Sequence, residues 1–374
     1  MAQTWRATAL ALLMALAGCS AGRGGPAPKP AAGAAAAPAA TAAPASAVAA
    51  PPALLPMRYA VQNSGSYSVL FLAADRGYFA QEGLDVDLVP FSSTSEMVPA
   101  LATNQIEAAT IGTNPALWNA VARDVTFKAV LDGTTFRPGR GTIALVVRKA
   151  VYDAGRGHSQ SDLGGLRLTL PPPGPGTTVG CAVNAGLQRA GASFADFAIE
   201  PLAATDQYTA LLNGAVDGGT ISEPFLSQLL RQDAVVKLAG LDELYPNFTL
   251  GVVLLSPTFW AQPAAAKGLV RAYIRASRDY DAAVSGRAGD AERAAVDEII
   301  ASHTGIPVVT VHDMIPLGVS RNGLPNLDAI MDCYRFFREQ GQIPEPVSDA
   351  QFQALWGTSL VNEVLTEIGR VPED

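Results

Sequence analysis

The sequence predicts an α/β protein of two lobes, in which each lobe is a mostly parallel sheet flanked by helices. Two stretches indicate this fold, because residues 57–89 and residues 166–189 both read as a strand, a polar or glycine-rich loop and a helix. Length is the third observation. Residues 57–374 are too many for one small hydrophobic core, so two lobes are expected.

The first stretch begins with a short apolar strand, residues 57–61, which ends in a polar loop. An apolar helix follows, and Gly77 is suited to the left-handed turn that commonly closes a helix. Residues 84–90 alternate as a strand does and return parallel to the first strand by a right-handed crossover. Ligands of open parallel sheets bind beyond the carboxyl ends of the strands. The first candidate binding residues therefore lie in the polar loop, at Ser64, Gly65, Ser66 and Tyr67.

Two more loops of the first lobe repeat this design. Ser93 and Thr94 follow the strand 84–90 and precede a helix, and Thr113 and Asn114 follow the expected strand EAATIG. Pro115 then occupies a first helical position. Ser, Thr and Asn at such places also cap helices. Capping and ligand contact are equally good interpretations of each residue taken singly.

The second lobe is expected to start after the apolar run TIALVVRK, which we interpret as a crossing between the lobes. Its glycine-rich loop lacks the spacing of a dinucleotide fingerprint and the Lys of a P-loop, so no nucleotide is predicted. The loop brings Thr177 and Thr178 to a helix N-terminus. At that position both residues are suited to face a ligand across a cleft. YPNFTLGVVLLS is interpreted as the return crossing, and helices are expected from Pro257 onward.

Glu223 ends a strand of the second lobe and precedes Pro224, so its carboxylate either faces the cleft or is held by a nearby basic residue or backbone amide. A cleft-facing Glu223 would favour an amine-bearing ligand over a plain anion, whereas Arg137 and Arg140 would favour an anion. Aromatic residues in or near the expected cleft loops favour a stacked, planar nitrogen heteroaromatic, with taurine as a second choice. They are Tyr67, Phe136, Phe225, Tyr245 and Phe248.

The N-terminus reads as a secretory signal peptide, residues 1–18, followed by Cys19. The small residues before Cys19 resemble a bacterial lipobox, which predicts a lipidated N-terminal cysteine; a signal peptide cut further on is the alternative. Residues 20–56 contain 17 Ala and 8 Pro. Residues 19–56 are therefore expected to form a disordered tether.

Charge and cysteines narrow the function further. All 34 acidic residues lie in residues 57–374, and no basic face appears in the sequence, so nucleic acid is an unexpected partner. The three His residues are widely spaced and lack a metal or triad pattern, so we expect no metal, no cofactor and no catalysis. Cys181 and Cys333 are expected to be buried free thiols because of their wide separation, although an oxidising compartment would allow them to pair.

The segment LAADRGYFAQEGLDVDLV, together with SDLGGL and ISEPF, resembles substrate-binding proteins of ABC importers for nitrate, sulfonates, taurine and thiamin-pyrimidine precursors. The resemblance implies the type II periplasmic binding protein fold, with residues 57–145 and 249–374 in lobe 1 and residues 146–248 in lobe 2. It also implies a monomer that binds its ligand by hinge closure.

The implied function is an extracytoplasmic, lipid-anchored receptor on a bacterial membrane. It would deliver a small nitrogen-containing or sulfonate-type molecule to an ABC permease and its ATPase. One alternative is an enzyme on the same fold acting on a pyrimidine or quinone precursor, but the cysteine-rich motif of a yeast pyrimidine synthase with this fold is missing here. A tethered ligand sensor is the other alternative.

Overall fold

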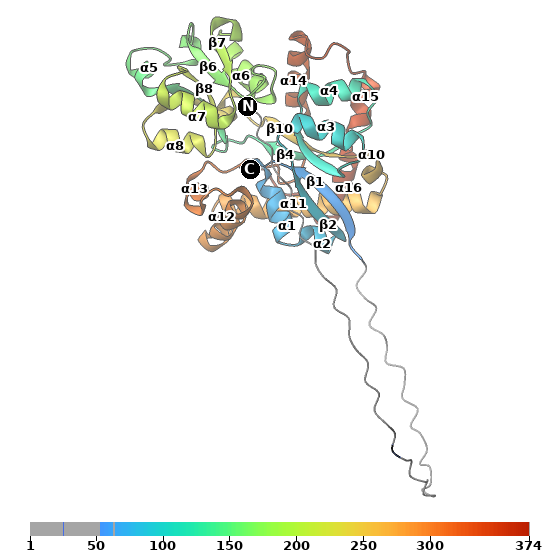
Figure 1. The fold of residues 1–374 in the computed structure, drawn as a ribbon. Coiled ribbons are helices and arrows are strands. Elements are labelled where there is room, and N and C mark those ends of the chain that lie inside the picture. The colour runs from blue at the N-terminus through green and yellow to red at the C-terminus, as the bar shows by residue number, and fades with distance from the viewer. Residues whose placement is uncertain (1–24, 26–52, 63, 374) are drawn as a thin grey trace, which may run out of the picture. The chain divides into compact units, whose positions relative to one another are not determined.

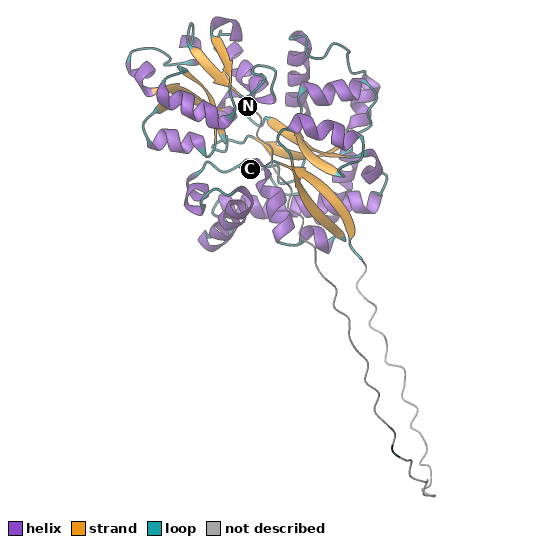
Figure 2. Ribbon diagram, viewed as in Figure 1, coloured by secondary structure: helices purple, strands orange, loops and turns teal. Residues whose placement is uncertain are grey.

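The computed structural model describes Gly25, residues 53–62 and residues 64–373, which contain two five-stranded sheets flanked by helices (Figure 1, Figure 2). The predicted α/β class and two-lobed plan are confirmed. The predicted signal peptide, Cys19 and most of the tether lie outside the described residues. In the part that is described, no helix has both the length and the apolar character of a membrane span.

The first sheet has the order β2-β1-β3-β10-β4. The strand β1 is parallel to β2 and β3, as the first stretch of the sequence predicts, and β10 is antiparallel to β3 and β4. Its core includes the fully buried Tyr59 and Trp118. The strands are β1 (Leu55–Val61), β2 (Leu84–Pro90), β3 (Ala108–Gly112), β4 (Lys128–Thr135) and β10 (Thr249–Leu255).

Short helices follow the parallel strands of this sheet. Gly77 adopts a positive φ of 67° between α1 and α2, which fulfils the prediction of a left-handed turn at this position. The helices are η1 (Gly65–Tyr67, a 3₁₀ turn), α1 (Ser68–Asp75), α2 (Tyr78–Gln81), α3 (Thr94–Ala102) and α4 (Pro115–Ala122).

The second sheet has the order β7-β6-β8-β5-β9, with β6 parallel to β7 and β8 and with β5 antiparallel to β8 and β9. Its strands are β5 (Ile143–Arg148), β6 (Arg167–Leu170), β7 (Ala198–Pro201), β8 (Gly218–Ser222) and β9 (Val235–Gly240). Its helices are α5 (Lys149–Asp153), η2 (Gln160–Asp162), α6 (Thr178–Arg189), η3 (Phe194–Asp196), α7 (Ala204–Asn213), α8 (Phe225–Arg231) and α9 (Leu241–Leu244).

The run TIALVVRK is not a crossing between lobes. It forms β5, which lies between β8 and β9, and its residues 144–147 are at most 1% exposed. A strand buried on both faces has a continuous apolar sequence, which explains the error. The crossing is the shorter stretch 136–142 before it, and the predicted lobe boundary at residue 145 falls inside β5. The predicted return crossing likewise contains β10, a strand of the first sheet.

Helices make up the chain after β10. The longest, α11, packs on α1 and α2, and α12 packs on α1, so both belong to the first lobe (Figure 1). These helices are α10 (Pro257–Trp260), α11 (Pro263–Val284), α12 (Asp290–Thr304), α13 (Val308–Asp313), α14 (Leu327–Glu339), α15 (Asp349–Leu355) and α16 (Thr358–Ile368).

The expectation of two free thiols is wrong, because Cys181 and Cys333 form a disulfide with a Cα–Cα distance of 5.5 Å. Cys181 lies on α6 of the second lobe, and Cys333 lies on α14, which also packs against α4 and β10 of the first lobe. The fold therefore brings together two helices that are 152 residues apart. The bridge ties the second lobe to the first lobe beside the peptide crossings.

Candidate ligand-binding site

The carboxyl ends of three parallel strands of the first sheet (β1, β2 and β3) and of two of the second (β6 and β7) face one cavity of about 820 Å³. The loops after β1, β2 and β3 line it from the first lobe, and the loops after β6 and β7 line it from the second lobe. This is where open parallel sheets bind ligands. The volume is within the range of pockets that take drug-sized molecules.

Helix caps fix the polar loops at the cavity wall. The Oγ of Ser93 accepts a hydrogen bond from Glu96 N at 3.3 Å, and Asn114 Oδ1 accepts one from Leu117 N at 3.2 Å. In the second lobe, Thr177 Oγ1 accepts one from Gly180 N at 2.9 Å. Capping and cavity lining are thus compatible roles, because a cap residue sits where the strand ends and the helix begins.

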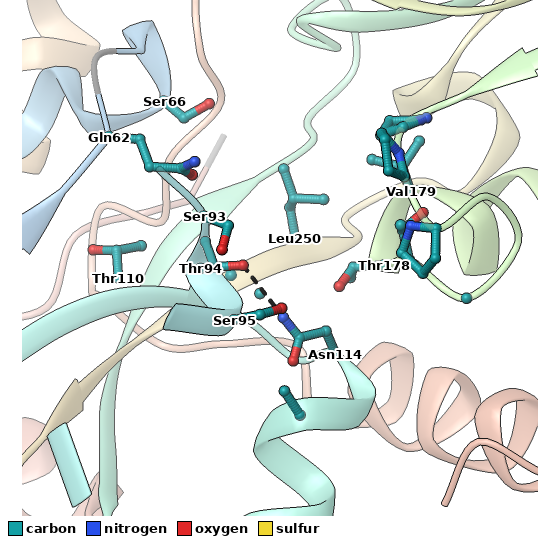
Figure 3. Close-up of a pocket in the computed structure, with 18 of the residues that line it drawn as sticks. Gln62, Ser66, Ser93, Thr94, Ser95, Thr110, Asn114, Thr178, Val179 and Leu250 are labelled. Carbon is teal, nitrogen blue, oxygen red and sulfur yellow. Dashed lines mark hydrogen bonds between the residues drawn. The ribbon is translucent and has the colours of Figure 1, made fainter. Parts of the chain in front are cut away.

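A cross-link joins two of the first-lobe loops. Asn114 Nδ2 donates to Thr94 Oγ1 at 3.3 Å, so the α3 and α4 N-termini present their polar groups together (Figure 3). Nearby, Tyr67 is buried and donates through its hydroxyl to the carbonyl oxygen of Thr110 at 3.2 Å. These bonds preorganise one wall of the cavity.

The facing wall comes from the N-terminus of α6. Thr178 points toward Thr94 and Asn114 across the cavity, and Val179 lines the same wall (Figure 3). The gap is narrow at one point, since a Cβ built on Gly112 would lie 3.0 Å from Thr178 Oγ1. A side chain at residue 112 would therefore press on the second lobe.

Eight of the twelve predicted binding residues line this cavity. They are Ser64, Ser66, Tyr67, Ser93, Thr94, Asn114, Thr177 and Thr178. The structure thus brings together residues from all four predicted polar loops, and their contact with a ligand stays a prediction.

The other four predicted residues lie elsewhere. Thr113 and Phe136 are fully buried, and Phe136 stacks on Phe248 with ring centroids 6.2 Å apart. Gly65 and Glu223 line a second cavity of about 180 Å³, next to Ile315. The loop that carries Ser64 and Ser66 touches both cavities.

Glu223 has protein partners that occupy both carboxylate oxygens. Its Oε1 accepts from Ser227 Oγ at 2.8 Å and from Ile315 N at 3.1 Å, and its Oε2 accepts from Ser227 N at 3.2 Å. Burial raises the pKa of Glu223 above its usual value, although the hydrogen bonds from Ile315 and Ser227 act in the opposite direction. Of the two interpretations, the structure shows the carboxylate held by backbone amides. It does not line the large cavity.

The arginines that suggested an anion are also engaged elsewhere. Arg137 pairs with Glu373, and Arg140 Nη1 lies 3.3 Å from Asp281 Oδ1. Both arginines line a separate cavity of about 800 Å³. Of the five aromatic residues considered for stacking, Tyr67 is the one that lines the cavity between the strand ends.

Sequence patterns missed part of the lining. Gln342, which follows α14, reaches the cavity beside Gly176, and Leu250 enters from β10. Residues 171–173, three consecutive prolines, form a rigid apolar wall. The prolines follow β6 directly, so the sequence could have indicated that they lie at the cavity. Gln342 lies in a loop between helices, and no sequence pattern there points to a binding site.

Comparison with known proteins gives a family and a fold. A family model described as NMT1/THI5 like matches residues 65–283. No curated protein matches the chain significantly. The solved structures show the same fold at low sequence identity.

Two of these structures illustrate the similarity. The periplasmic aliphatic sulphonate-binding protein SsuA of Escherichia coli is 20% identical, with a TM-score of 0.62 over 79% of this chain and 91% of its own. The periplasmic nitrate-binding protein NrtA of Synechocystis is 14% identical, with a TM-score of 0.67 over 84% of this chain and 89% of its own.

Proposed function

The chain belongs to the NMT1/THI5-like family, and on this premise we propose that it is the extracytoplasmic substrate-binding component of an ABC importer. The carrying observation is the cavity between the strand ends, because both lobes line it with polar groups that are already fixed by caps. The sulphonate- and nitrate-binding proteins with this fold support the proposal by analogy.

Ligand binding favours closure of the two lobes in this proposal. Contacts from Thr94 and Asn114 on one side and Thr178 on the other are simultaneous only when the lobes approach each other. A ligand of nitrogen-containing or sulfonate type remains the family-based expectation. The specific argument for an amine loses its basis, since Glu223 is held by Ser227 and Ile315.

Membrane attachment through Cys19 is part of the proposal. Cys19 follows Leu16, Ala17 and Gly18 at the end of the apolar run, the pattern of a lipidation site. Two or more acyl chains hold a protein stably at a bilayer. A Cys19→Ala variant should lose the diacylglycerol mass and leave the membrane fraction; retention of both would contradict the anchor.

The function is tested by native mass spectrometry of the full chain purified from cells, followed by denaturation and identification of the released molecule. Gly112→Leu should abolish the binding of this molecule, because the new side chain meets Thr178 and fills the space between the two walls of the cavity. Gly164→Leu is the matched control, since a Cβ there has no atom within 4 Å. Equal ligand loads in both variants would contradict binding in this cavity.

Uptake assays separate the three candidate functions. Deletion of the gene should abolish import of the released molecule if the protein serves a permease. Unchanged import with altered gene expression would favour the tethered sensor. Chemical conversion of the molecule by purified protein would favour the enzyme, for which the described lining provides hydroxyl and amide groups but no residue of the His, Cys, Asp, Glu or Lys type.

A further inference from the structure

The cavity between the strand ends carries no ionic charge on its described walls. None of the described residues that line it is Asp, Glu, Lys, Arg or His. Arg137 and Arg140 are paired with Glu373 and Asp281 at another cavity. A charged ligand enclosed here would therefore lose its hydration without gaining an opposite charge, which is costly in a low-dielectric site.

Helix N-termini offset this cost only in part. The helices α3, α4 and α6 start at the cavity, and their dipoles favour negative charge. However, Ser93, Asn114 and Thr177 already accept amide hydrogens of their own helices, and Pro115 has no N–H to offer. Fewer amide donors are left for an anion than three uncapped helices would present.

Glu96 weakens the dipole further at α3. It lies in the first turn of that helix, next to the wall formed by Thr94 and Ser95. A carboxylate in the first turn neutralises part of the positive end of the helix. The field at this wall is thus less favourable for an anion.

One buried polar side-chain atom of the lining, Gln342 Oε1, lacks a partner among the described residues. A buried acceptor requires a donor. The N–H or O–H group of a ligand would supply it, whereas nitrate and simple sulfonates offer acceptors alone.

Apolar surface completes the lining. Residues 171–173 and Val179 from the second lobe face Pro115, Ala116 and Leu250. These side chains bury the apolar face of a ligand without any hydrogen-bonding requirement.

We infer that the cavity binds an uncharged molecule of drug-like size, with an apolar face and at least one N–H or O–H donor directed at Gln342. This inference rests on the proposed function, because it names the ligand class of the same site.

The test uses a bacterial metabolite extract divided by ion exchange into unretained, anionic and cationic fractions. The full chain, freed of bound molecules by partial unfolding and refolding, is mixed with each fraction and examined by native mass spectrometry. We expect an adduct from the unretained fraction. An adduct from an ionic fraction alone overturns the inference and leaves the receptor function intact, whereas no adduct from any fraction contradicts the receptor function itself.

A charge-sign experiment gives a second, independent outcome. Ser95 is exposed and lines the cavity, so Ser95→Lys and Ser95→Asp should both fold, with Ser95→Gln as the uncharged control of similar size. For an uncharged ligand, we expect both charged variants to change the affinity for the captured molecule alike. Opposite shifts on the order of tenfold, with Lys strengthening and Asp weakening binding or the reverse, would show a charged ligand and overturn the inference.

Discussion

Removing the bridge between the lobes should cost a large part of the stability of the protein. The perturbation is Cys181→Ala together with Cys333→Ala. Both residues are at most 3% exposed, and their helices belong to different lobes, with α6 in the second and α14 packed on the first. Near the bridge, the hydroxyl of Tyr245 donates to Asp332 Oδ2 on α14 at 2.6 Å. This hydrogen bond would remain in the variant without the disulfide.

The magnitude follows from the length of the closed loop. The two cysteines are 152 residues apart. In the chain-entropy description, closing a loop of this size lowers the conformational entropy of the unfolded chain, which stabilises the folded state by about 5 kcal/mol at 25 °C. Native disulfides usually contribute about 2–5 kcal/mol to the unfolding free energy. We therefore expect the double variant to unfold with a free energy about 3–5 kcal/mol lower than the wild type.

Urea titration with and without dithiothreitol measures this difference. Cys19 is replaced by Ser in every sample, so that no third thiol takes part in exchange. Reduced wild type should match the double variant, and the double variant should not respond to dithiothreitol. Equal unfolding free energies of the oxidised and reduced wild type would refute the reasoning, because the bridge would then not constrain the unfolded chain.

Two further predictions concern buried carboxylates. Glu223→Ala leaves the amides of Ile315 and Ser227 without their acceptor, so it should lower the unfolding free energy by about 1–3 kcal/mol, while Glu200→Ala at an exposed site should change it little; an equal effect of both would contradict the contact. Burial raises the pKa of Asp132 to about 6, so the folded state binds the proton more tightly than the unfolded state does. Lowering the pH from 7 to 4.5 should accordingly add stability through this group, about 2 kcal/mol, and Asp132→Asn should lack that increment in urea titrations at the two pH values.

Local features of the fold were predictable because their causes are local. The cap at Asn114, the proline that follows it and the left-handed Gly77 each depend on a few neighbouring residues. The strand order at the first crossover follows from the handedness of parallel connections. For the same reason the polar loops converge at one end of the sheet, so that eight of the twelve predicted residues line one cavity, and their contact with a ligand stays a prediction.

Long-range contacts decide the features that the sequence did not predict. Glu223 turns toward Ile315, 92 residues later, and Cys181 meets Cys333 on a helix that also packs on the first lobe. Neither pairing leaves a periodic or turn signal near the residues involved. The run that forms β5 was predicted wrongly for a related reason. A strand that is buried on both faces has a continuous apolar sequence, and so does a segment that crosses between two lobes.

Beside the peptide crossings, three contacts that hold the second lobe come from the chain that follows β10. Cys333 holds α6 from one helix, while Ile315 binds Glu223 through its amide and packs against the apolar side chains of the second lobe. Arg231 adds an ion pair with Asp313 at 3.2 Å. The loops after β1, β2 and β3 thus supply the polar groups of the first-lobe wall. The segment from Asp313 to Gln342 holds the second lobe in position opposite that wall. Gln342 itself enters the cavity, so the same segment restrains the movement of the second lobe and contributes the unpaired acceptor Gln342 Oε1. A change in the position of the second lobe therefore moves Gln342 relative to Thr178.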